Sequence, residues 1–194
     1  MDFDPDGLTQ FVREMGIRKN LNDLQFQYEL LKTRLELEGR DFAEKLTELE
    51  TQIADVKSEL LKTISSSSIF SKLAQEIDKT KSALQKLESK KSELSGDIYE
   101  KIKKEYQQKL ADSRKNFSLE LPKLKTYLKT VETKLSQFDE KIEELNLRIQ
   151  LENTEEYQEL LKETLNQKER LFMGKNAAKS ILDTLKDPEN TLGL

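Results

Sequence analysis

Clusters of glutamate and lysine are the residues of this sequence whose types and spacing would support chemistry. Glutamates gather at 140–144 and 155–159, where carboxylates one helical turn apart would offer oxygen ligands to a divalent cation. Lys101, Lys103 and Lys104 would contact the phosphate groups of a lipid headgroup or a nucleic acid. Runs of like charge on an amphipathic helix are usually solvated, so the glutamates do not predict a metal site.

Other reactive groups are few. The 194 residues contain no histidine and no cysteine, which removes the commonest general base, the commonest metal ligand and thiolate chemistry. The sequence also lacks a glycine-rich phosphate loop. We therefore predict no catalytic residue, no cofactor and no enzyme activity.

The composition favours long helices over a thick globular core. Charged residues make up 36% of the chain, and glycines and prolines are few. The net charge of −4 divides into −5 for residues 1–66, +4 for 67–115 and −3 for 116–194. The acidic stretch would therefore fold back on the basic stretch or pair with another copy. No signal peptide or run of about 20 apolar residues is found, so we expect a cytoplasmic protein.

The elements that would position these groups begin with a short amphipathic helix at residues 1–16. Asp4 is expected to cap this helix and Pro5 to occupy its first turn, while Gly16 offers a hinge after it. Its apolar face consists of Leu8, Phe11, Val12 and Met15. We expect this face to pack on the main coil as an end cap. A partner or membrane face is the alternative, opposed by the neighbouring aspartates.

Two longer segments follow. Residues 17–64 are expected to form one acidic coiled-coil helix, whose apolar spacing is irregular near Phe42. The serines at 65–68 predict a turn, because their side chains compete for backbone hydrogen bonds. Residues 69–118 are expected to form a basic coiled-coil arm that carries the three lysines, with a turn or kink near Gly96.

The C-terminal segment, residues 122–186, is predicted to be a helical hairpin. Pro122 suits the first turn of a helix, so the preceding helix is expected to end near Phe117. Asn153 is expected to cap the second helix of the hairpin, and residues 187–194 to form a flexible tail. The apolar seam predicted to mediate self-association consists of Leu124, Leu128, Val131, Leu135, Phe138, Ile142, Leu145 and Ile149.

Together these segments predict an all-α fold, an elongated coiled coil whose long helices fold back as antiparallel helical hairpins. The basis is the alternation of three- and four-residue steps between apolar side chains. A long helix with such a stripe needs a partner to cover it.

Part of the chain resembles the coiled-coil region of archaeal CdvA-like cell-division proteins. The resemblance rests on the run from Leu94 to Tyr106, a turn feeding a helix with spaced tyrosines, and on the leucine-rich segment 124–149 that returns through a turn to Tyr157. It covers residues 94–172. It implies a scaffold that polymerises at membranes and recruits ESCRT-III-like partners. The β-barrel of typical members has no counterpart in residues 1–66, which departs from that family.

The sequence leads to three function hypotheses. The first is a non-enzymatic scaffold or spacer that self-associates as a homo-oligomer and binds partner proteins through helical seams, in cell division or membrane remodelling. The second is a membrane-associated ESCRT-III-like assembly factor. The third is a structural tether linked to nucleic acid. A membrane surface is a less favoured partner than protein, and nucleic acid is less favoured still, because acidic residues interrupt the lysine-rich stretch.

Overall fold

The computed structural model describes residues 3–38, 42–64, 68–152 and 154–185, and within these ranges the chain forms helices and no strand. The helices are α1 (Pro5–Glu38), α2 (Ala43–Thr63), α3 (Ile69–Ser89), the 3-10 turn η1 (Lys91–Glu93), α4 (Gly96–Glu152) and α5 (Glu155–Thr184). The predicted all-α class is confirmed. The tail predicted at residues 187–194 lies outside the described residues.

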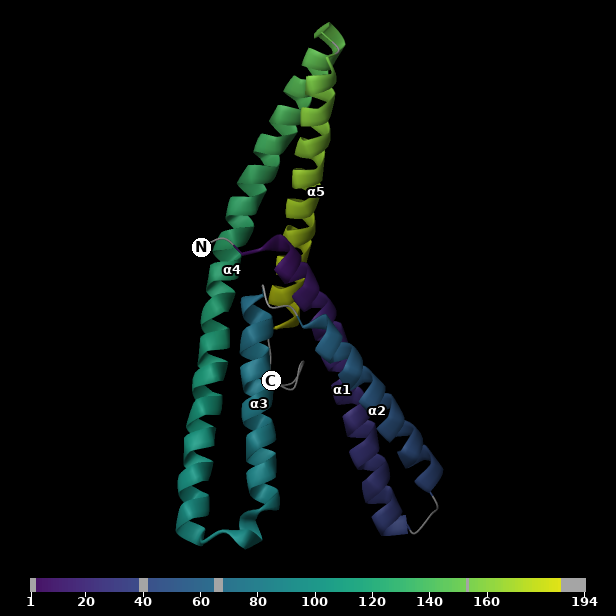
Figure 1. The fold of residues 1–194 in the computed structure, drawn as a ribbon, viewed down its shortest axis with the longest axis vertical. Coiled ribbons are helices and arrows are strands. Elements are labelled where there is room, and N and C mark those ends of the chain that lie inside the picture. Colours follow the sequence, from purple (N-terminus) through teal and green to yellow (C-terminus); the bar gives the residue numbers. More distant parts are fainter. Residues whose placement is uncertain (1–2, 39–41, 65–67, 153, 186–194) are drawn as a thin grey trace.

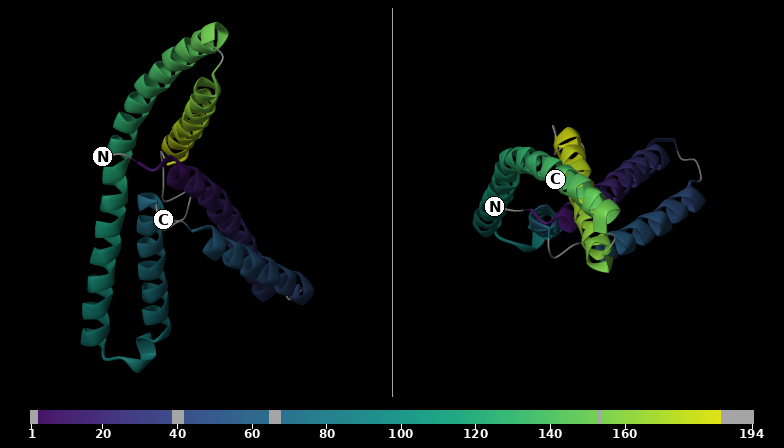
Figure 2. Two further views of the ribbon diagram at one scale, coloured as in Figure 1. Left: turned by 45° about the horizontal axis from the view of Figure 1, so that its top comes forward. Right: turned by 90° about the horizontal axis from the view of Figure 1, so that it is seen from above.

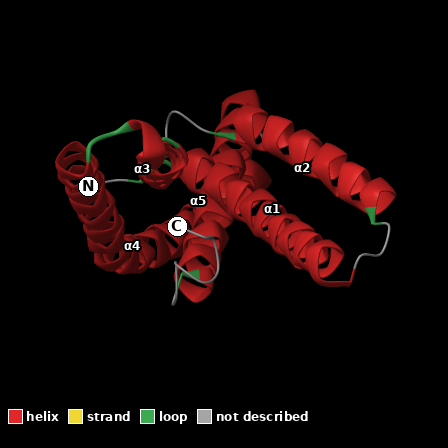
Figure 3. Ribbon diagram, turned by 90° about the horizontal axis from the view of Figure 1, so that it is seen from below, coloured by secondary structure: helices red, strands yellow, loops and turns green. Residues whose placement is uncertain are grey.

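The helices form three arms that extend from a common centre (Figure 1). The first arm consists of α1 and α2, which lie side by side and run in opposite directions. The second arm consists of α3 and the N-terminal half of α4, and the third arm of α5 and the C-terminal half of α4. The first arm points away from the other two (Figures 2 and 3). Among the described residues α2 packs on α1 and α3 on α4, so the acidic stretch does not fold back along the basic stretch, and pairing with another copy stays a prediction.

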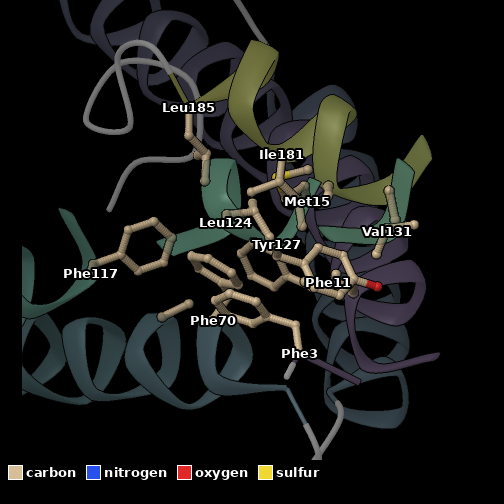
Figure 4. Close-up of a cluster of buried hydrophobic side chains, with 14 of the residues drawn as sticks. Phe3, Phe11, Met15, Phe70, Phe117, Leu124, Tyr127, Val131, Ile181 and Leu185 are labelled. Atoms are coloured by element: carbon tan, nitrogen blue, oxygen red, sulfur yellow. The ribbon is translucent and has the colours of Figure 1, made fainter. Parts of the chain in front are cut away.

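The three arms meet in a hub of buried apolar side chains (Figure 4). At its centre Phe11, Phe70 and Phe117 bring together α1, α3 and α4, with ring centroids 5.4 to 6.2 Å apart. Burial of each such side chain stabilises the fold by about 1.5–3 kcal/mol. The hub is made of Phe3, Leu8, Phe11, Met15, Phe70, Ala74, Ile77, Phe117, Leu124, Tyr127, Val131, Leu135, Ala177, Ala178, Ile181 and Leu185.

A buried polar network joins α1 to α3 beside the hub. Arg18 Nε donates a hydrogen bond of 2.9 Å to Glu14 Oε1, and Arg18 Nη1 lies 2.5 Å from Asp78 Oδ2. Ser71 Oγ donates to the second carboxylate oxygen of Glu14 at 2.5 Å. Glu14 and Ser71 are fully buried. A buried charge is tolerated only when it is paired, so this network ties α1 to α3 at one position.

The boundaries of α1 and α2 differ from those predicted. α1 runs without interruption through Gly16 to Glu38, so residues 1–16 are not a separate helix. A glycine inside a helix destabilises it by only about 1 kcal/mol, and Met15 beside it is anchored in the hub. The single helix predicted for residues 17–64 is also wrong, because α1 ends at Glu38 and a second helix, α2, begins at Ala43 and returns along α1. The return covers part of an apolar stripe that one long helix would leave exposed.

The helix end predicted near Phe117 is wrong as well. α4 continues for 57 residues through Pro122. Phe117 and Leu124, on either side of the proline, are buried in the hub, while Pro122 lies on the exposed side of the helix. Burial of these neighbours outweighs the backbone hydrogen bond that proline removes. α4 curves along its length (Figure 2), as a helix lacking one internal hydrogen bond can.

Other boundaries agree with the sequence. Asp4 accepts hydrogen bonds from the backbone of Asp6 and Gly7 and thereby caps α1. α2 ends at Thr63 and α3 begins at Ile69, which agrees with a helix break at the predicted position, although serines 65–67 lie outside the described residues. Ser68 caps α3 by accepting from Ser71 N at 3.3 Å. The turn or kink predicted near Gly96 is a turn, since α3 ends at Ser89 and α4 begins at Gly96. The cap of α5 is Thr154, whereas Asn153 lies outside the described residues.

Candidate interaction groove

The apolar face predicted for partners or membranes is not exposed. Leu8, Phe11 and Met15 belong to the hub, and Val12 packs against it. Phe11 is fully buried between Phe70 and Phe117. The face is therefore an internal packing surface, as the favoured prediction of packing against other helices expected, and the alternative of a partner or membrane face is wrong.

The seam predicted for self-association is also internal. Leu124, Val131, Leu135 and Leu145 are buried within the chain. The remaining members, Leu128, Phe138, Ile142 and Ile149, are half-buried. α4 packs along α5, whose residues Ala177, Ala178 and Ile181 share the hub with this seam. The regular spacing marks a face of α4 that α5 largely covers inside the chain, while Phe138 stays partly exposed at its edge.

The three lysines predicted to contact phosphate lie in the first turns of α4, at the tip of the second arm. Lys101 and Lys104 are exposed. Lys103 Nζ instead donates to the Tyr99 hydroxyl at 3.1 Å, and that hydroxyl donates to the Glu88 carboxylate. The bond to Tyr99 raises the pKa of Lys103, and the bond from Tyr99 lowers the pKa of Glu88. Lys103 therefore joins the two helices of the arm tip.

Two further findings concern metal binding and membrane crossing. In the described part of the chain, no three acidic side chains come together as a group that could hold a metal ion, including the glutamates at 140–144 and 155–159. Among the described helices, none combines the length and apolar character needed to cross a bilayer.

The two edges of the seam between α4 and α5 differ in charge. Along one edge, acids of α4 pair with lysines of α5: Asp139 Oδ1 lies 2.5 Å from Lys168 Nζ, and Glu132 Oε1 lies 3.0 Å from Lys175 Nζ. The hydrogen bond from Lys175 lowers the pKa of Glu132. Seven residues separate the members of each set, so the pairs recur two turns apart and close this edge.

The other edge is an open groove. Two adjoining hollows of about 300 and 430 Å³ share Lys134, Phe138 and Leu171. The interaction groove is lined by Phe3, Pro5, Tyr127, Thr130, Val131, Lys134, Gln137, Phe138, Lys141, Gln167, Arg170 and Leu171. Among the described residues, this lining contains three cations and no carboxylate. An apolar floor with a cationic rim suits an apolar side chain flanked by negative charge.

The three cations of the interaction groove are not equivalent. Arg170 bonds to Asp6 at 2.6 Å and to Asp4 at 3.1 Å, so its charge is used to hold the start of α1 against α5. The bond to Asp6 also raises the pKa of Arg170. Lys134 and Lys141 are exposed and lie two turns apart on the same side of α4. These two lysines are the ones that an anionic partner would meet.

Sequence reasoning missed the interaction groove because its wall on α4 ends at Lys141 and its wall on α5 begins at Gln167, 26 residues later in the chain. Lys134 and Lys141 flank Phe138 in the sequence, and this was the available signal. This signal indicates a groove only together with Leu171, which α5 brings next to Phe138 in the folded chain. Comparisons with family models, curated proteins and solved structures gave no match to this chain. The resemblance to CdvA-like proteins therefore stays a prediction.

Proposed function

We propose that this chain is a non-enzymatic, cytoplasmic scaffold that self-associates and binds partner proteins through the surfaces of its arms. The observation that carries the proposal is the combination of one shared hub with three arms that are each only two helices thick. The hub fixes the arms relative to one another, and the arms present helical surfaces far from it (Figure 1). Such a shape suits a part that positions other proteins.

The incomplete burial of the arms supports this function. In the first arm Leu24 and Leu31 of α1 and Leu49 and Ile53 of α2 are only half-buried. Two helices alone cannot enclose a seam, so apolar area remains at its edges. A further helix from another protein would cover that area and extend the pair to three helices.

The two alternative functions receive less support. A membrane-associated assembly factor would need to insert Leu8, Phe11, Val12 and Met15 into the bilayer. Three of these side chains belong to the hub, and Val12 packs against it. A nucleic-acid tether was to use the lysines of the second arm, of which Lys103 is held by Tyr99. A role in cell division or membrane remodelling stays a prediction from the resemblance.

The test is a mixture of nitrogen-15-labelled and unlabelled chains treated with a lysine crosslinker, together with light scattering over a range of concentrations. We expect mixed-isotope crosslinks between lysines of the arms and a mass that rises with concentration. A monomeric mass throughout, with crosslinks only inside single chains, would contradict self-association.

A further inference from the structure

We propose that the interaction groove binds the outer face of α1 from a second copy of the chain, with Phe26 as the inserted side chain. This inference rests on the self-association in the proposed function and specifies its two surfaces. The contact is heterologous, because the groove lies on the third arm and its occupant on the first arm. Each copy would then offer one groove and one ligand face.

Phe26 is an unusual residue for the outer face of a helix. Its side chain is 70% exposed, and Leu30, one turn later on the same side, is 45% exposed. Both point away from α2, since the Tyr28 hydroxyl donates to Glu50 of α2 and a residue two positions before or after Tyr28 lies on nearly the opposite side of the helix. A phenyl ring and a leucyl group one turn apart form a typical anchor for a groove between two helices.

The charges around Phe26 complement those around the groove floor. Asp23 precedes Phe26 by three residues and Glu29 follows it by three, so exposed carboxylates flank the ring on both sides. In the groove, Lys134 lies four residues before Phe138 and Lys141 three residues after it, so each end of this ring's site along α4 carries a cation.

The spacing of the two charge sets also matches. Asp23 and Glu29 are about 9 Å apart along the axis of α1, and Lys134 and Lys141 are about 10.5 Å apart along α4, at 1.5 Å per residue. Two carboxylates would thus meet two ammonium groups while Phe26 rests on Phe138 and Leu171. Electrostatic matching of this kind selects the partner surface more than it adds affinity.

The connectivity of the contact has a consequence for the assembly. A contact between two different surfaces leaves a free groove at one end and a free α1 face at the other, so copies add until a ring closes or a filament forms. The other exposed apolar positions do not show this match. Leu151, for example, is 84% exposed at the tip of the third arm and is not part of the groove.

The test uses two charge-reversed chains. One carries Lys134→Glu and Lys141→Glu, and the other carries Asp23→Lys and Glu29→Lys. Each alone places like charges on both surfaces, so we expect both to be monomeric by analytical ultracentrifugation. Mixed in equal amounts they restore opposite charges at every contact, and we expect association to return. Circular dichroism of each chain checks that the helices are intact.

Two single variants complete the experiment. Phe26→Gln should weaken association by about thirtyfold, as expected for loss of a central aromatic anchor. Leu151→Gln is the matched control and should leave it unchanged. Wild-type association that survives Phe26→Gln and both charge reversals would overturn this inference and leave the proposed function standing. A wild-type chain that is monomeric at every concentration would overturn both.

One further arm tests a different occupant of the same groove. Flotation with vesicles that contain an anionic lipid is compared for the wild type and the Lys134→Glu, Lys141→Glu chain. The proposal expects no difference between the two chains. Vesicle binding that is lost in the reversed chain, without protein self-association, would assign the groove to lipid headgroups and overturn the proposal.

Discussion

Replacement of Gly174 by alanine tests how closely α5 approaches the start of α1 and the middle of α4. A Cβ at this position would lie 2.7 Å from Pro5 Cβ, 2.9 Å from the Tyr127 hydroxyl oxygen and 3.0 Å from Pro5 Cα. Carbon atoms pack favourably at about 3.5–4.0 Å, so three atoms are too close. Because the proline ring is rigid, Pro5 cannot move aside by changing rotamer.

The expected change in the free energy of unfolding is the sum of two opposing contributions. Alanine in place of glycine inside a helix stabilises the protein by about 1 kcal/mol, whereas overpacking a filled site destabilises it by about 1–3 kcal/mol. Gly16 provides the control, since it also lies inside a helix and its added Cβ would meet no atom within 4 Å. Gly16→Ala should therefore raise stability by about 1 kcal/mol, while Gly174→Ala should leave it unchanged at best or lower it by up to about 2 kcal/mol.

The assay is urea unfolding followed by circular dichroism, supported by thermal unfolding. For a chain of this size each kcal/mol shifts Tm by about 2–4 °C, so the two variants are readily distinguished. Equal stabilisation by both alanines would refute the close approach of α5 to Pro5 and Tyr127.

Three further substitutions test the buried polar network, the continuity of α4 through Pro122, and the ion pairs that close one edge of the seam between α4 and α5. Arg18→Met leaves the buried Glu14 carboxylate without its cation and should reduce the free energy of unfolding by about 3–5 kcal/mol in urea titrations; a loss under 1 kcal/mol would mean that the pair is solvated. Pro122→Ala restores a backbone hydrogen bond in α4 and should raise Tm, whereas a fall would show that the proline shapes the hub. The pKa of Glu132 is lowered by Lys175, so its contribution is present above the ordinary carboxyl pKa and lost as pH falls through the lowered value. The Tm difference between wild type and Glu132→Gln should therefore shrink on acidification from pH 7, and a difference independent of pH would contradict the pairing.

Local signals in the sequence identified the helices and several of their ends. Asp4 and Ser68 cap helices because their short polar side chains reach backbone N–H groups a few residues ahead, a contact that depends on nearby sequence alone. The regular spacing from Leu124 to Ile149 likewise identified the face of α4 that is covered. What covers it could not be predicted, because α5 and another copy present similar apolar stripes.

The errors came where packing over long distances outweighs local preference. Pro122 predicts a helix end on local grounds, but Phe117 and Leu124 hold α4 in the hub on both sides of it. In α5 the larger apolar residues Leu165 and Phe172 are exposed, while Gly174 is buried. The space beside Pro5 and Tyr127 admits only a residue without a side chain, which no periodicity reveals. The interaction groove was not predicted for the same reason, since its walls come together only in the folded chain.

The continuous helix α4 sets the distance between the tips of the second and third arms. One helix of 57 residues supplies a strut to both the second and the third arm, and at 1.5 Å per residue it is about 85 Å long when straight. The distance between the two arm tips is thus set by the number of residues and the curvature at the hub. Proteins attached at these tips would be held at a defined separation, and adding or removing whole heptads between Phe117 and either end would change it in steps of about 10 Å.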